Sequence, residues 1–209
     1  MPIPIKVAII DDEESARKSL ARLMKSAGIE AATFASAPEF LADPIRESMD
    51  CVLTDLRMPD LDGLKFQEQL SQVLPAVSIV FLTGQGSISS SVRAMKAGAV
   101  DFLEKTIGED ALMATIKDAA ARSRRARVER AELEELLNRF AHLTARERQV
   151  FALVAGGLLN KQIGFDLGVA ERTIKVHRRR VMDKMQATSV AELVRMADRL
   201  GVRTKDQPP

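Results

Sequence analysis

Four short apolar runs in the first half of the chain each end at side chains that can handle a phosphoryl group. The runs are residues 7–10, 51–54, 77–82 and 100–104. The side chains that follow them are, in the same order, Asp11 with Asp12, Asp55, Thr83 and Lys105. If the runs are neighbouring parallel strands, these groups meet beyond the carboxyl ends of the strands, where open α/β sheets place their sites.

Three crowded carboxylates repel one another and favour a bound cation. Mg2+ takes oxygen ligands and keeps several of its waters, so Asp12, Asp55 and a main-chain carbonyl near Arg57 are candidate ligands. Asp11 would then hold a metal-bound water. The predicted cofactor is therefore Mg2+.

The same edge has the groups that phosphoryl transfer to an aspartate needs. A carboxylate can act as a nucleophile and become an aspartyl phosphate. Lys105 would neutralise one phosphoryl oxygen, and Thr83 would donate a hydrogen bond to another. A haloacid-dehalogenase-like phosphatase also uses an aspartate with magnesium, but that class needs a second acid two residues further on, where this chain has Arg57.

Segments of helical period alternate with the apolar runs up to about residue 105. A helix at 15–27 that stops at Gly28 precedes a further strand at 29–34. Other helices are expected at 37–41, from about 64, and from 88 to a stop at 98, with loops at 57–63 and after Thr83. Strand–helix alternation repeated five times predicts a doubly wound α/β fold with a parallel sheet covered on both faces.

Residues 109–140 contain no Pro or Gly and are rich in strong helix formers. They predict one helix, on the order of 45 Å long at about 1.5 Å per residue, that links two domains. Its apolar residues form a heptad-like seam that is weak at Ser123, Ala126 and Arg130. The second part of the seam either packs within its own chain or pairs with a second copy; it contains Leu133, Leu136, Leu137 and Phe140.

Charge is distributed unevenly along the chain. Residues 1–120 carry 12 basic and 18 acidic side chains, a net charge of −6, whereas residues 121–209 carry 19 and 11, a net charge of +8. Halves of opposite sign indicate two domains with different partners, the basic one a candidate for nucleic acid. Two ordinary solvated surfaces would give the same counts.

The sequence has no feature typical of a secreted or membrane protein. Its single cysteine, Cys51, lies in an apolar run and is interpreted as a small core residue without a redox or metal role. Lys6 interrupts the N-terminal apolar stretch, which argues against a signal peptide. No apolar stretch approaches the roughly 18 residues of a membrane span, so we expect a cytoplasmic protein.

Four short helices are predicted from Thr144 onward. Thr144 and Glu147 form a capping box at the start of the first, which ends at Gly156. Asn160 is expected to cap the second helix, and Gly168 to end it. The helices are expected at residues 144–155, 161–167, 171–185 and 190–200. Two short helices joined by a tight turn, the second strongly basic, form a helix-turn-helix.

The second helix of this motif concentrates four cationic side chains over two turns. Ile174 and Val181 are seven residues apart and should face inward, which leaves Lys175, Arg178 and Arg179 exposed. A basic helix of this width fits the major groove of B-DNA. Charge alone would suit a solvated face, an RNA or an acidic protein equally well.

Residues 5–120 resemble the receiver domain of bacterial two-component response regulators. The resemblance lies in IIDDE at 9–13, TDLRMPDLDG at 54–63, FLTG at 81–84 and AMKAGA at 94–99. It implies a five-stranded sheet of order 2-1-3-4-5. It also implies these roles: Asp55 as phosphoacceptor, Asp11 and Asp12 as metal-site acids, Thr83 and Lys105 as phosphoryl sensors, and Phe102 as an aromatic switch that turns inward when Thr83 moves.

One position departs from that family. Receiver domains normally follow the lysine with a proline joined by a cis bond, whereas Lys105 is followed by Thr106. A cis bond before a non-proline residue costs about 2.5–4 kcal/mol, so a trans bond with Lys105 held differently, away from Asp55, is the less costly hypothesis. For this reason a phosphorylation-independent receiver, serving only as a dimerisation platform, stays an alternative.

Residues 141–203 resemble the LuxR-type helix-turn-helix. The matching residues are Thr144, Arg146 and Glu147, then GLLNKQI at 157–163, LGV at 167–169 and TIKVH at 173–177. With the receiver, they identify the chain as a member of the NarL/FixJ family, similar to its FixJ branch. This implies that Lys175, Val176 and Arg179 face bases. The residues implied to lie against DNA phosphates are Lys161, Thr173, His177, Arg180 and Lys184.

The combined expectation is a DNA-binding transcription regulator, not an enzyme, that a sensor histidine kinase switches by phosphorylating Asp55. Its expected parts are a receiver at 1–120, a linker helix at 121–140 and a DNA-binding domain at 141–209. Expected partners are the kinase, promoter DNA and RNA polymerase, with no membrane. Phosphorylation is expected to produce a homodimer through the receiver and the linker helix.

Overall fold

The computed structural model describes residues 3–58, 62–84 and 88–202, except the side chains of 88–90. Parts of two predicted loops, residues 59–61 after Asp55 and 85–87 after Thr83, lie outside the described residues. The chain divides into two compact units, one up to Val128 and one from Glu129. No helix of the described ranges is both long and apolar enough to span a membrane.

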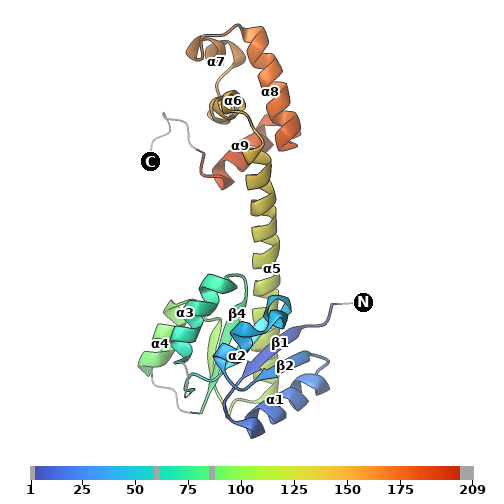
Figure 1. Cartoon of the computed structure of the whole chain (residues 1–209), viewed down its shortest axis with the longest axis vertical. Helices are drawn as coiled ribbons and strands as arrows, with labels where there is room; N and C mark the ends of the chain where they lie inside the picture. The colour runs from blue at the N-terminus through green and yellow to red at the C-terminus, as the bar shows by residue number, and fades with distance from the viewer. Residues whose placement is uncertain (1–2, 59–61, 85–87, 203–209) are drawn as a thin grey trace. The chain divides into compact units, whose positions relative to one another are not determined.

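A five-stranded parallel sheet organises the first unit (Figure 1). The strand order β2-β1-β3-β4-β5 confirms the predicted doubly wound topology. Its strands are β1 Lys6–Ile10, β2 Glu30–Phe34, β3 Cys51–Thr54, β4 Ser78–Thr83 and β5 Asp101–Glu104. In the pairing register Ile10 lies beside Thr54 and Thr83 beside Glu104, so the carboxyl ends of these strands share one edge.

Helices follow the strands where their period predicts them. Those that pack on the sheet are α1 Glu14–Ser26, α2 Ala37–Ala42, α3 Gly63–Val73, α4 Ile88–Lys96 and the first part of α5 Glu109–Ala141. A short 3-10 helix, η1 Pro44–Ser48, was not predicted. It begins where the Asp43 carboxylate accepts a hydrogen bond from the N–H of Ile45.

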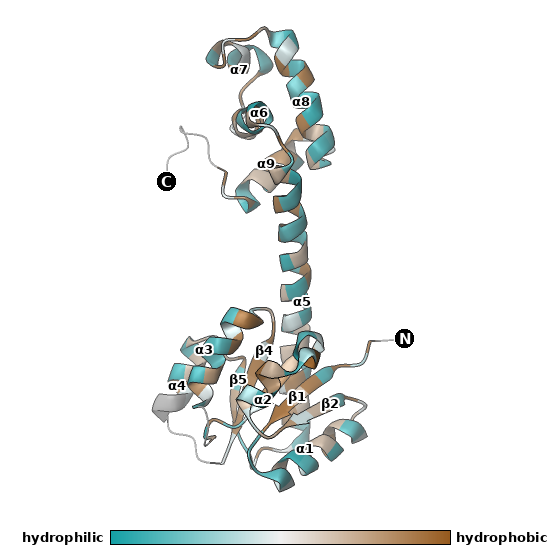
Figure 2. Ribbon diagram, in the orientation of Figure 1, coloured by the Kyte–Doolittle hydropathy of each residue, from teal (hydrophilic) through white to brown (hydrophobic). Residues whose placement is uncertain are grey.

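The core of the first unit lies on both faces of the sheet. Successive strand residues point to opposite faces, and β1 shows the consequence. Val7 and Ile9 pack against α1 and α5, whereas Ala8 and Ile10 pack against α2, α3 and α4. Figure 2 shows the central strands β1 and β4 as strongly hydrophobic, with hydrophilic residues on the outer faces of the helices of this unit.

Helix α5 remains attached to the first unit beyond residue 120. The Ser123 side chain is fully buried, and its Oγ accepts a hydrogen bond from the N–H of Ser78 at 2.8 Å. The same hydroxyl donates to the carbonyl of Ala119 at 3.2 Å. A polar residue interrupts the apolar seam here because it satisfies the main chain at the start of β4. The boundary expected at 120 falls inside this attached segment.

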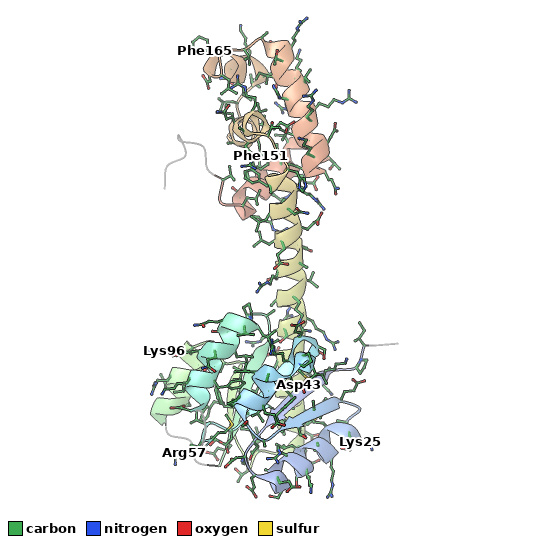
Figure 3. All side chains as sticks on the ribbon, in the orientation of Figure 1. Lys25, Asp43, Arg57, Lys96, Phe151 and Phe165 are labelled. Atoms are coloured by element: carbon green, nitrogen blue, oxygen red, sulfur yellow. The ribbon has the colours of Figure 1, made fainter. Side chains whose placement is uncertain are left out.

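Up to residue 202, where the described residues end, the second unit consists of the end of α5 and four further helices. They are α6 Ala145–Ala155, α7 Asn160–Asp166, α8 Glu171–Met185 and α9 Val190–Arg199. Leu136 of α5 is buried in their common core, whereas Leu137 is 49% exposed. Of the two alternatives for the second part of the seam, Leu136 therefore follows the first, packing within its own chain. Figure 3 labels Phe151, which is buried in this core, and Phe165, which projects from α7.

The ends of these helices agree with the predicted caps in one case and not in another. The capping box of Thr144 and Glu147 is present on α6. The prediction that Asn160 caps α7 is wrong, because the helix begins at Asn160 itself. Its amide oxygen instead accepts a hydrogen bond from Arg178 of α8 at 3.0 Å, which joins the two helices of the motif.

Candidate functional site

The side chains of Asp11, Asp55 and Lys105 meet at the carboxyl edge of the sheet. Lys105 Nζ lies 2.6 Å from Asp11 Oδ2 and 2.9 Å from Asp55 Oδ2. The Asp11 side chain is 2% exposed and that of Asp55 is 12% exposed. The two carboxylates therefore share one ammonium, and the carboxylate of Asp55 is the more accessible to a reactant.

Main-chain contacts orient the Asp55 carboxylate. The N–H of Asp55 donates to the carbonyl of Ile10 at 3.1 Å, which continues the pairing of β1 and β3 past the strand. Asp55 Oδ1 accepts a hydrogen bond from the N–H of Arg57 at 3.2 Å, in the loop where Figure 3 labels Arg57. The turn that leaves β3 thus directs this carboxylate toward Lys105.

The Lys105 ammonium is held in its charged form by this arrangement. Burial alone would lower the pKa of Lys105, but hydrogen bonds and charge attraction from Asp11 and Asp55 outweigh burial and raise it. A lysine at this point remains a cation at neutral pH. It can pair with whichever anionic oxygens are nearest.

The peptide bond between Lys105 and Thr106 is trans. This agrees with the less costly of the two hypotheses for a non-proline residue here. The second part of that hypothesis is wrong, because Lys105 is not turned away from Asp55. Its own N–H donates to the carbonyl of Thr83 at 2.9 Å, so β5 delivers the side chain to the edge before Thr106 begins.

The third acid of the predicted set is arranged differently. The side chain of Asp12 is exposed, whereas Asp11 is buried. Within the described ranges, no group of three or more Asp, Glu, His or Cys side chains is arranged to hold a metal ion. Asp11 and Asp55 are the acids that the fold brings together, and Asp12 follows Asp11 in the chain.

The two predicted switch residues lie on neighbouring strands. Thr83 is buried at the end of β4. Phe102 of β5 is half-buried, and its ring lies 6.0 Å from that of Phe81, with an interplanar angle of 41°. Phe102 is therefore not fully enclosed in the core, although its ring lies close to that of Phe81.

Helix α8 presents a basic and partly apolar surface. Ile174 and Val181 are fully buried, as predicted, while Lys175, Val176 and Arg179 are exposed. Arg178 was predicted to be exposed beside Lys175 and Arg179, but it does not belong to that exposed face. It is half-buried by its hydrogen bond to Asn160, so its guanidinium fixes α7 on α8.

Two family models match the chain in the order of its two units. The response regulator receiver domain matches residues 7–117, and the bacterial regulatory proteins of the luxR family match residues 141–197. Nodulation protein W of Bradyrhizobium diazoefficiens is 41% identical over 196 residues, covering 94% of this chain and 86% of that protein. The transcriptional regulatory protein FixJ of Azorhizobium caulinodans is 39% identical over 206 residues, covering 99% and 98%.

The chain belongs to the NarL/FixJ family of response regulators. It is a two-component transcription regulator with a receiver and a LuxR-type DNA-binding domain. The structure of the response regulator StyR matches it with a TM-score of 0.81 and 41% identity, covering 94% of this chain and 99% of that one. Full-length FixJ from B. japonicum matches with a TM-score of 0.55 and 39% identity, covering 95% and 98%.

The residues of this regulator predicted to lie against DNA phosphates differ in accessibility. Lys161 and Arg180 are exposed, whereas Thr173 and His177 are half-buried. Lys184 is 38% exposed, and its Nζ lies 2.7 Å from Glu147 Oε2 and 3.2 Å from the carbonyl of His142. Lys184 therefore has an internal partner that its sequence position did not indicate.

Glu147 of the DNA-binding domain does more than cap α6. Burial would raise its pKa, but the Lys184 ammonium and the hydrogen bonds from Thr144 lower the pKa of Glu147 to about 2. The spacing of Thr144 and Glu147 predicted the capping box but not the ion pair between Glu147 and Lys184. The partner lies 37 residues further along the chain, beyond the reach of any helical period.

Proposed function

We propose that a sensor histidine kinase phosphorylates Asp55 of this regulator and that the phosphorylated form binds promoter DNA as a homodimer. The observation that carries the proposal is the shared ammonium, with Lys105 Nζ 2.9 Å from Asp55 Oδ2 and 2.6 Å from Asp11 Oδ2. This geometry sets a nucleophilic carboxylate beside a cation that can accept a phosphoryl oxygen.

In the proposed transfer, an Asp55 carboxylate oxygen forms a bond to phosphorus while the P–N bond of a kinase phosphohistidine breaks. The released imidazole nitrogen takes a proton from solvent. Lys105, whose pKa is raised, then leaves the two carboxylates and pairs with a phosphoryl oxygen. Asp11 remains an anion beside the new group, so the product needs further positive charge.

Mg2+ would supply that charge when bound, since it offsets the repulsion between a phosphodonor and the acidic edge, the sheet edge that carries Asp11, Asp12 and Asp55. Asp11 and Asp55 share one cation already, and their oxygens are the hard ligands that Mg2+ prefers. The set that would hold the ion is Asp11, Asp12, Asp55 and the carbonyl of Arg57. These residues fit the ion by ligand type, and the side chains of two of them, Asp11 and Asp55, already converge on Lys105.

The proposed switch uses Thr83 and Phe102. Phosphorylation adds about −1.5 to −2 charge at the edge. Thr83 would donate a hydrogen bond to a phosphoryl oxygen, and the half-buried Phe102 ring would turn further inward beside Phe81. The receiver surface beyond β4 and β5 would thereby change shape.

The DNA-binding domain would read bases with Lys175, Val176 and Arg179, whose side chains α8 exposes. Two copies would present two such helices to half-sites about one turn of DNA apart. Lys161, Thr173, His177, Arg180 and Lys184 are proposed phosphate contacts. Pairing through the receiver and α5, and a contact with RNA polymerase, belong to the same proposal.

The test of phosphorylation is the intact mass of the protein after incubation with Mg2+ and acetyl phosphate. We expect the wild type to gain one phosphoryl group and Asp55→Asn to gain none. Asp62→Asn is a matched control, because Asp62 lies in the same loop region and an asparagine can still accept the hydrogen bond from Leu64 N–H. A wild type that gains no mass would favour the dimerisation-platform alternative.

The test of recognition compares binding to promoter and random duplexes. Arg179→Ala should lower the preference for the promoter, whereas Lys161→Ala should weaken both and reduce the salt slope by about 1. Dimer formation on phosphorylation is measured by sedimentation equilibrium. Equal losses on both duplexes for Arg179→Ala would contradict the base-reading role.

A further inference from the structure

Arg17 of α1 reaches back to the acidic edge, and nothing in the local sequence pattern had marked it. Its Nη1 donates to the main-chain carbonyl of Asp11 at 2.6 Å. The Arg17 side chain is half-buried, and the helix positions it because the N–H of Arg17 bonds to the carbonyl of Glu13 at 3.1 Å. A guanidinium from α1 therefore contacts the main chain of Asp11, whose carboxylate faces Lys105.

The carbonyl that Arg17 binds has no place in the sheet. The last paired carbonyl of β1 toward β3 is that of Ile10, which accepts from the N–H of Asp55. The N–H of Asp11 still donates to the main-chain carbonyl of Phe34 at 3.3 Å. The carbonyl of Asp11, however, belongs to the residue after the last residue of β1. Arg17 supplies the donor that this main-chain group would otherwise have to find in water.

Apart from its N–H, which donates to the carbonyl of Phe34, Asp11 is fixed at three further points by the start of α1 and by Lys105 after β5. Arg17 holds its carbonyl at 2.6 Å, the N–H of Glu13 holds Oδ1 at 2.9 Å, and Lys105 holds Oδ2 at 2.6 Å. The first of these contacts sets the plane of the peptide between Asp11 and Asp12. Together with the φ angle of Asp12, that plane sets the direction in which the Asp12 side chain leaves the backbone.

We propose that Arg17 is a positioning residue for the divalent-ion site: it orients the Asp11–Asp12 peptide so that both carboxylates serve the phosphoacceptor Asp55. The inference rests on the proposed function. Partners that orient metal ligands in this way are worth about 10–100-fold in affinity. A guanidinium is charged at any working pH, so its effect on a cation has two parts of opposite sign, repulsion by charge and improvement by orientation.

Because the charge and the orientation by Arg17 have opposite effects on Mg2+ affinity, its removal distinguishes the two. Arg17→Ala removes a positive charge, which by Coulomb attraction alone would tighten Mg2+ binding. The positioning role predicts the reverse, a Mg2+ dissociation constant raised about tenfold. We expect Arg17→Lys, which keeps the charge on a shorter side chain, to bind Mg2+ more weakly than the wild type as well. Arg22→Ala is the matched control, since Arg22 is exposed on the same helix.

The experiment is calorimetric titration of the full chain with Mg2+ in the absence of any phosphodonor, at a temperature where every variant is folded. Amide exchange of Asp12 and Glu13 in metal-free protein is the second readout, and we expect it to accelerate in Arg17→Ala. Tighter Mg2+ binding, or binding and exchange equal to those of Arg22→Ala, would overturn the proposal. If Arg17→Ala does not fold, an unchanged dissociation constant in Arg17→Lys overturns it instead.

The mass experiment on Asp55 separates this inference from the proposed function. A wild type that takes no phosphoryl group, with Mg2+ binding still weakened by Arg17→Ala, would contradict phosphorylation and support the positioning role. A wild type phosphorylated on Asp55, with Arg17→Ala indistinguishable from Arg22→Ala in both readouts, would contradict the positioning role alone.

Discussion

Asp50 Oδ2 lies 2.7 Å from Nη2 of Arg124, so the residue before β3 is bonded to the middle of α5. The other oxygen of the same carboxylate lies 3.2 Å from Arg127 Nη1. Oδ2 also accepts the N–H of Lys6 at 3.1 Å, and Arg124 donates to the carbonyl of Pro4 at 2.8 Å. These contacts explain why the first compact unit extends to Val128.

Asp50→Asn should therefore loosen α5 from the receiver. The Asp50 side chain is almost fully buried, and the change leaves two guanidinium groups without their anion. We expect a loss of about 1–3 kcal/mol in the free energy of unfolding of the receiver and faster amide exchange across residues 121–128. Asp118→Asn, which breaks the exposed pair with Arg122 on the same helix, should cost about 0–1 kcal/mol. Equal effects of the two changes would contradict the role of Asp50.

The pair of Glu147 and Lys184 should make the DNA-binding domain sensitive to acid. The pKa of Glu147 is lowered from 4.5 to about 2 in the folded chain. Stability from a lowered carboxyl pKa is complete above the unfolded value and is lost as pH falls toward the folded one. We expect the urea midpoint, followed by amide signals of α6 and α8, to fall between about pH 5 and pH 2. Glu147→Gln should be less stable at neutral pH and show a flatter profile over that interval.

Two lysines of the proposed phosphate set should differ when replaced. Lys161 is exposed, so Lys161→Ala should weaken DNA binding and leave the unfolding free energy unchanged. Lys184→Met should cost about 1–3 kcal/mol of stability, because buried Glu147 loses its cation. Its DNA affinity is to be measured at a temperature where the domain is folded. A Lys184 variant as stable as the Lys161 variant would show that the internal pair contributes nothing.

The single thiol of the chain offers a probe of receiver unfolding. Cys51 is fully buried in β3, and burial, with the nearby charge of Asp50, raises its pKa to about 12. Since the thiolate is the reactive form, we expect a disulfide reagent to label native protein far more slowly than the chain in concentrated urea. Labelling of the native protein at the rate of a free small thiol would contradict the burial of β3.

Much of the architecture follows from the order of residue types along the chain. The alternation of Val7, Ala8, Ile9 and Ile10 between two apolar faces requires a sheet covered on both sides, and the sheet does pack on both. Acids, a hydroxyl and a lysine at the ends of successive runs converge because parallel strands end at one edge. The inward positions of Ile174 and Val181 follow from helical period. These features are local, and spacing within a few turns or strands is enough to predict them.

Only the tertiary structure decided which polar groups become partners when they are far apart in the sequence. Lys105 finds Asp11 at a separation of 94 residues, Arg124 finds Asp50 at 74, and Lys184 finds Glu147 at 37. Arg178 belongs to the exposed face by helical period, yet Asn160 draws it inward. A period reports which face of an element is apolar. It does not report which charge from another element will lie against that face, because burial penalises unpaired charges only once the elements have packed.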